Sequence, residues 1–125
     1  MKDLSKLYAH LPYFEQTAGQ EPRRLIKEAG VFYVEYEQDM NDFLDAYYAA
    51  EWTDTAYPDT LAGAGITSPA DMEAAISGAD RPLLKAMLTQ MVREERFGTG
   101  ALARYAGSGL IAGVLRRMKE LEDAE

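Results

Sequence analysis

Residues 88–100 read Leu-Thr-Gln-Met-Val-Arg-Glu-Glu-Arg-Phe-Gly-Thr-Gly. At about 100° per residue, Leu84, Leu88 and Met91 form one apolar stripe, which is typical of an amphipathic α-helix. The next position on this stripe is Glu95, and a carboxylate on a core-facing row is costly unless another group pairs with it. We therefore expect Glu95 to be buried and to pair with a basic side chain or a tyrosine hydroxyl outside its own helix.

The helical period recurs along most of the chain. The clearest helices are predicted over residues 33–50, 81–97 and 110–122, and shorter ones include residues 3–11, 22–28 and 69–77. Residues 31–36, Val-Phe-Tyr-Val-Glu-Tyr, have the composition of a strand. Because no second strand is evident, these residues are interpreted as the entry to the 33–50 helix. The sequence thus predicts a single all-α domain over residues 1–125, a compact bundle of five to seven helices.

The composition narrows the classes of function. The chain has 125 residues, of which 47% are hydrophobic, enough for one globular core. It has no cysteine, which excludes disulfides, thiolate metal sites and cysteine nucleophiles. No apolar run approaches the ~18 residues that span a bilayer, and no secretory signal pattern is evident at the start. We expect a cytoplasmic protein without a membrane partner.

The charge is strongly negative and unevenly distributed. The net charge is −8, and residues 35–59 hold eight acidic residues and no basic one. Nucleic-acid binding depends on clustered lysine and arginine, so no nucleic-acid partner is expected. Most of the arginines lie within residues 81–119, and the acidic and basic regions either pair between copies of the chain or form solvated faces.

Two further sets of residues have types that occur in metal-binding or catalytic sites. Glu35, Asp39 and Asp42 have the spacing of one helical face and could hold a hard cation. The aromatic stripe of the same predicted helix lies on its opposite side and is expected to face the core. The three acidic residues are therefore interpreted as its solvated face, and no metal and no cofactor are expected. The single histidine, His10, has no cysteine partner and no serine in a nucleophile motif, so no catalytic residue is assigned.

The candidate ligand or structural polar site consists of Arg93, Glu95 and Arg96. Adjacent residues of a helix do not face each other, so Glu95 needs a partner on another element. One interpretation is a structural network of ion pairs. The other is a pocket in which the arginines hold a carboxylate or a phosphate.

Several motifs resemble an uncharacterised family of small bacterial proteins, domain-of-unknown-function family 6508. The most specific is Leu-Thr-x-x-Val-Arg-x-Glu-Arg-Phe-x-x-Gly at residues 88–100, followed by Ile-x-x-Val-Leu-Arg-Arg-Met-Lys-Glu-Leu at 111–121. Weaker similarity lies in Leu-Pro-Tyr-Phe-Glu at 11–15 and Tyr-x-x-Tyr-x-x-x-Met-x-x-Phe at 33–43. The resemblance implies signature positions at Arg93, Glu95, Arg96, Phe97 and Gly100. It implies a small helical fold and no reaction.

The sequence favours a protein that acts by binding, as a homodimer or with a protein partner. Its candidate contact surfaces are the acidic face at residues 35–45 and a group of nearby aromatic residues, Tyr33, Tyr36, Tyr47, Tyr48, Trp52 and Tyr57. One alternative is a small-molecule enzyme or sensor with an Arg/Glu pocket around residues 93–97. Another, suggested by charge alone, is an acidic protein that mimics DNA.

Overall fold

The computed structural model describes residues 4–19, 23–28, 31–97 and 100–124, but not the side chains of residues 21–35, 96 and 97. Its helices are α1 (Ser5–Tyr8), α2 (Leu11–Thr17), α3 (Gln38–Ala49), α4 (Tyr57–Gly63), α5 (Pro69–Ala75), α6 (Arg81–Phe97), α7 (Ala101–Gly107) and α8 (Leu110–Asp123). A 3-10 turn, η1 (Ile76–Gly78), follows α5, and strands β1 (Arg23–Glu28) and β2 (Val31–Tyr36) lie between α2 and α3. The predicted all-α class is confirmed for the body of the protein, because its core is built from helices.

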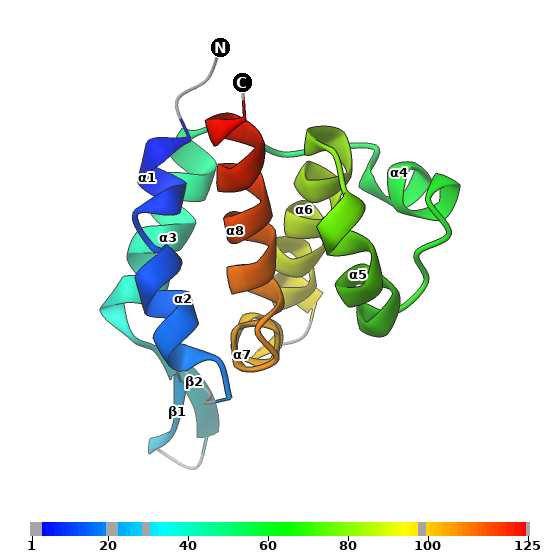
Figure 1. The fold of residues 1–125 in the computed structure, drawn as a ribbon. Helices are drawn as coiled ribbons and strands as arrows, with labels where there is room; N and C mark the ends of the chain where they lie inside the picture. Colours follow the sequence, from blue (N-terminus) through cyan, green and yellow to red (C-terminus); the bar gives the residue numbers. More distant parts are fainter. Residues whose placement is uncertain (1–3, 20–22, 29–30, 98–99, 125) are drawn as a thin grey trace.

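Helix α8 is a common neighbour of five other helices. It packs against α1, α2, α5, α6 and α7, and Figure 1 shows it between the α1–α3 side and the α4–α6 side. Its apolar face is buried, as the sequence predicts, through Leu110, Ile111, Val114, Leu115 and Met118. In the described part of the chain, no helix combines the length and apolar character needed to cross a membrane.

Helix α6 carries the predicted apolar stripe on its buried face. Leu84, Leu88 and Met91 are fully buried. Apolar burial stabilises a fold by about 25 cal/mol per Å² of surface removed from water, so these side chains hold α6 firmly in the core. The backbone of α6 is therefore held against the rest of the bundle as far as Met91.

A short chain of hydrogen bonds joins α3, α6 and the segment that follows α3. The buried Thr89 hydroxyl donates to the Lys85 carbonyl oxygen at 2.8 Å, so the Tyr47 hydroxyl, 3.2 Å away, donates to it. Tyr47 in turn accepts from the Thr53 hydroxyl at 3.0 Å, and the Asp54 N–H donates to Thr89 at 3.0 Å. The buried hydroxyls are satisfied in this way, as buried polar groups must be.

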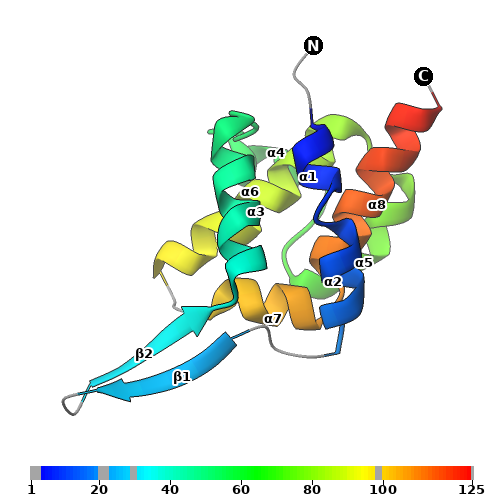
Figure 2. The same ribbon diagram turned by 90° about the vertical axis from the view of Figure 1, so that its left-hand side faces the viewer.

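The local prediction for residues 22–36 is wrong. Residues 23–28 form a strand and not a helix, and residues 31–36 pair with it instead of beginning α3. The strands are antiparallel, with Leu25 opposite Val34 and Ile26 opposite Tyr33. Residues 31–36 therefore form the strand that their composition favours, because residues 23–28 form a second strand with which they can pair. Figure 2 shows the hairpin projecting away from the helices.

The hydrogen-bonded chain through Thr89 gives a test of the packing between α3 and α6. Thr89→Val keeps the shape of the side chain but leaves the Asp54 N–H and the Tyr47 hydroxyl without their partner. We expect the free energy of unfolding to fall by about 1–3 kcal/mol, the usual cost of unpaired buried polar groups. Urea unfolding measures the change, and Thr55→Val, at an exposed position, should have little effect. Equal effects of the two substitutions would contradict this interpretation.

Candidate functional site

The polar side chains of Arg93, Glu94 and Glu95, in the last turns of α6, have different contacts. The Glu95 carboxylate accepts a hydrogen bond from the Tyr36 hydroxyl at the end of β2. This is the kind of partner expected for Glu95, a hydroxyl from outside its own helix. Glu95 is half-buried, which is less than the largely buried position predicted for it, because it lies near the end of α6, where the hairpin meets the helical body.

Glu95 also holds the start of α7. Its two carboxylate oxygens each accept from the Gly100 N–H at 2.9 Å, and Oε1 is 3.4 Å from the Leu102 nitrogen. The first N–H groups of a helix have no partner within it, and a negative charge there is favourable. Gly100 has φ +99°, in the left-handed region that glycine adopts without strain. The contacts of Glu95 therefore support a structural role.

Arg93 and Glu95 do not meet. Two positions apart on a helix, they are separated by about 200° around its axis. Arg93 lines a small pocket of about 60 Å³ together with Tyr47, Tyr48, Thr53 and Val92. Arg96 belongs to α6, but its side chain lies outside the described residues. The described side chains of the predicted polar site thus diverge, since Arg93 lines this small pocket and Glu95 does not.

The residue between them, Glu94, was not singled out by the sequence. One carboxylate oxygen accepts from the Gln90 side-chain amide at 2.5 Å, and the other accepts from the Tyr105 hydroxyl at 2.5 Å. Burial, followed by the hydrogen bond to Glu94, raises the pKa of Tyr105 above its usual range. All three residues line a cavity of about 200 Å³ that α4, α5, α6 and α7 surround.

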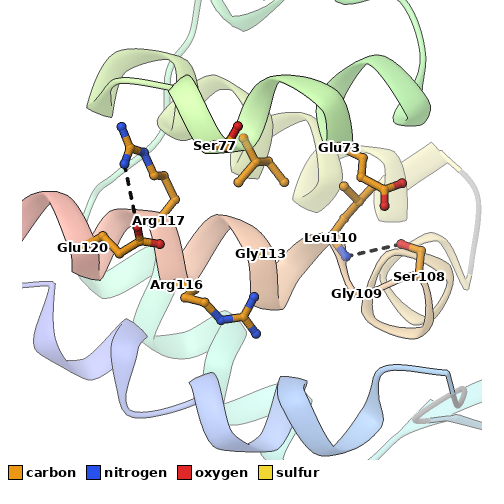
Figure 3. A pocket seen from close by; sticks show the side chains of 10 residues that line it. Glu73, Ser77, Ser108, Gly109, Leu110, Gly113, Arg116, Arg117 and Glu120 are labelled. Carbon is orange, nitrogen blue, oxygen red and sulfur yellow. Dashed lines mark hydrogen bonds and ion pairs between the residues drawn. The ribbon is translucent and has the colours of Figure 1, made fainter.

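A second cavity, of about 350 Å³, lies between α8 and the segment containing α5 and η1 (Figure 3). Arg117 donates to the Ala79 carbonyl oxygen at 3.1 Å and lies 3.8 Å from the Glu120 carboxylate. Arg116 points away from Arg117 and pairs with Glu15 of α2 at 3.3 Å. The two cations of this cavity are therefore each matched by a carboxylate of the chain.

The other candidates are placed as follows. Glu35 belongs to β2, so the helical spacing proposed for it with Asp39 and Asp42 does not exist. Asp39 and Asp42 are exposed on α3, as expected for its solvated face. The His10 ring lies edge-on to Phe43, with centroids 5.9 Å apart. Within the described residues, no cluster of three or more acidic or histidine side chains could hold a metal ion.

The aromatic residues after β2 divide between core and surface. Tyr47 and Trp52 are buried, whereas Tyr48 is 49% exposed. The edge-on contact of Phe14 with Phe43, at 4.8 Å between centroids, joins α2 to α3. The aromatic stripe of α3 therefore serves mainly the core, and Tyr48 is its exposed member.

Comparison with known proteins places the whole chain in one family. The model of a family of unknown function, DUF6508, matches residues 1–124, and the chain belongs to that family. A search of the curated proteins found no match, and neither did a search of the solved structures.

The contact between Tyr36 and Glu95 can be measured by a double-mutant cycle. Glu95→Ala removes the carboxylate that holds both Tyr36 and the start of α7, so we expect it to lower the free energy of unfolding by about 1–3 kcal/mol. Tyr36→Phe removes only the hydroxyl and should cost less. Urea unfolding of the two single variants and the double variant should show a coupling of at least about 0.5 kcal/mol. Strictly additive effects would contradict the contact.

The tyrosines predict a loss of stability in alkali. Burial raises the pKa of Tyr8 to about 12, with Glu122 adding to the effect, and the pKa of Tyr105 is also raised. An unfolded tyrosine ionises near pH 10, so the stabilising contribution is complete below pH 10 and is lost as the pH rises towards 12. Urea midpoints measured between pH 8 and 11.5 should therefore fall. Tyr105→Phe should make the fall less steep, and an unchanged slope would contradict the prediction.

Proposed function

Because the family to which the chain belongs has no assigned function, we propose from the geometry that this protein acts by binding, and that it binds a second copy of itself through β2. The observation that carries this proposal is the hairpin, a two-stranded ribbon that projects from the helical body (Figure 2). A hairpin of two strands is only marginally stable in water unless further strands or a helix cover it.

The residues of the hairpin have the pattern of a sheet that is covered on both sides. Leu25 pairs with Val34, and the next pair along the ladder is Ile26 with Tyr33. Successive residues of a strand lie on opposite faces, so each face of the ribbon carries an apolar pair. A sheet with one face in water normally alternates apolar and polar residues. This pattern supports the presence of a partner.

The two edges of the ribbon differ in charge. Strand β1 reads Arg-Arg-Leu-Ile-Lys-Glu, with four charged residues, whereas β2 reads Val-Phe-Tyr-Val-Glu-Tyr, with one. Lysines and other charges on an edge strand oppose pairing with another chain. Edge β1 is protected in this way and β2 is not. A symmetric pairing through β2 would give a four-stranded sheet in the order β1–β2–β2–β1.

The charges at the two ends of the ribbon are compatible with a second copy as the partner. In an antiparallel pairing, the turn end of each hairpin lies beside the root of the other. The turn end has Lys27 next to Glu28, and the root has Arg23 and Arg24 on β1 and leads into the exposed acidic residues Glu37, Asp39 and Asp42. Both signs therefore occur at each end, and the pairing does not oppose two ends of one sign. Ion pairs formed there would be weakened by salt, since the screening length is about 10 Å at 0.1 M.

The alternatives have less support. A pocket shared by Arg93 and Glu95 has no counterpart among the described side chains, because Arg93 lines one pocket and Glu95 holds α7. Mimicry of DNA is favoured by the net charge alone. Nothing further in the described residues favours it.

A cysteine scan of the hairpin tests the proposed dimer, because the chain has no cysteine of its own. Single cysteines are introduced at each position of β2 and, as matched controls, at the register partners on β1. A disulfide needs Cα atoms within about 7 Å. Mild oxidation should therefore give a covalent dimer for at least one β2 position near the symmetry axis. The β1 strands would lie about 14 Å apart, three strand spacings of about 4.8 Å, and should not cross-link.

Sedimentation provides the second measurement. Tyr33→Lys places a charge on the proposed seam and should shift the association to at least about tenfold higher protein concentration. Tyr48→Lys, at the exposed position on α3, should leave it unchanged. A monomer of 13.9 kDa at all concentrations and salt conditions, or equal cross-linking from both strands, would contradict the proposal.

A further inference from the structure

The cavity beside Glu94 has a charge that its own walls do not balance. Among the described residues that line this cavity of about 200 Å³, one carries a carboxylate and none is a lysine, arginine or histidine. Glu94 is half-buried, and a partly buried carboxylate is stabilised by a cationic partner. We propose that this cavity binds a small organic cation, a primary ammonium group on a short apolar body.

The shape and lining of the cavity fit the apolar part of such a ligand. Four buried side chains line it, those of Leu61, Ile66, Met72 and Tyr105, and each is 7% exposed or less. Its volume is below the about 300–1,000 Å³ typical of sites for drug-sized ligands. The ligand is therefore small, with a body of a few carbon atoms or one aromatic ring.

The hydrogen bonds of Glu94 leave room for an ammonium group. Its present donors are the Gln90 amide and the Tyr105 hydroxyl, one to each oxygen, and both donors are neutral. An ionised carboxylate has about four acceptor positions, so acceptor capacity remains on each oxygen. An ammonium group supplies three N–H donors together with the missing charge. An anionic ligand would instead be repelled.

The Tyr105 hydroxyl keeps the carboxylate in place as an acceptor. Burial raises the pKa of Tyr105, so its phenol keeps its proton at neutral pH and continues to donate to Glu94. The Gln90 amide reaches the carboxylate from one turn earlier on α6. The carboxylate is thus oriented from two helices before any ligand enters.

The cavity of Figure 3 provides the contrast. Its carboxylates include Glu120, which lies 3.8 Å from Arg117 of the same wall. The walls of this cavity also include two arginines, Arg116 and Arg117, whereas the described walls of the cavity beside Glu94 include no cation. The cavity beside Glu94 is therefore the one of the two whose described walls lack a positive charge.

Binding can be tested with a charged probe and its neutral counterpart, 2-phenylethylammonium and 2-phenylethanol. Heteronuclear NMR follows the methyl groups of Leu61, Ile66 and Met72 during each titration. We expect saturable shifts with the ammonium probe at millimolar concentrations. The affinity for the alcohol should be at least about tenfold lower, because a charge-assisted hydrogen bond is roughly twice as strong as a neutral one.

Two variants and a control locate the effect. Glu94→Gln keeps the shape of the side chain and one acceptor oxygen but removes the charge, so the ammonium probe should bind it no better than the alcohol. Met72→Trp fills the cavity and should abolish binding of both probes. Glu120→Gln makes the same chemical change in the other cavity and should leave binding as in the wild type.

Three results would overturn the proposal: no saturable shift with the ammonium probe, equal binding of the two probes, or undiminished preference in a folded Glu94→Gln variant. If Glu94→Gln fails to fold, the ratio between the two probes on the wild-type protein and the effect of Met72→Trp still decide the question. The cavity contains no residue of the hairpin, so a failed dimerisation test leaves this inference unaffected.

Discussion

The Glu95 carboxylate joins three segments that are far apart in the sequence. It lies on α6, accepts from Tyr36 at the end of β2, and binds backbone N–H groups at the start of α7 through Gly100. A half-buried charge needs several donors, and here two neighbouring segments supply them. The position of the hairpin and the direction of α7 both depend on this side chain, so its place on a core-facing row is explained by architecture.

Helix α6 is the part of the chain most open to prediction, because its apolar period is regular. The stripe of Leu84, Leu88 and Met91 is buried as predicted, and Glu95 has a hydroxyl partner outside its helix. The same period shows why Arg93 and Glu95 could not share a pocket: two positions apart, they lie on different sides. The sequence does not indicate a role for Glu94. Its hydrogen-bond partner Tyr105 and the cavity residues of α4 and α5 come close to it only through tertiary packing.

The hairpin was missed for a different reason. The composition of residues 31–36 indicates a strand. Four of the six residues in 23–28 are charged, so that segment does not have the composition of a strand. The available signal was spacing: two six-residue segments separated by two residues, one of them Gly30, fit a β-hairpin. The backbone N–H and C=O groups of residues 31–36 need hydrogen-bond partners in either conformation. In a helix these partners would be residues of the same segment, whereas in this structure they are residues of 23–28. Local propensity alone could not choose between them.

Two residues on either side of the hairpin are linked to the two ends of α7, Gly19 directly and Tyr36 through Glu95 of α6. Before β1, the Gly19 N–H donates to the Gly107 carbonyl oxygen at the end of α7, at 2.6 Å. After β2, Tyr36 binds the carboxylate that holds the start of α7. The last residue of β2 is thus tied to the helical body through Glu95. In the proposed dimer, a β2 strand held at this end would lose less freedom on binding its partner. Because α7 also carries Tyr105, the same helix borders the cavity beside Glu94 and supports the hairpin.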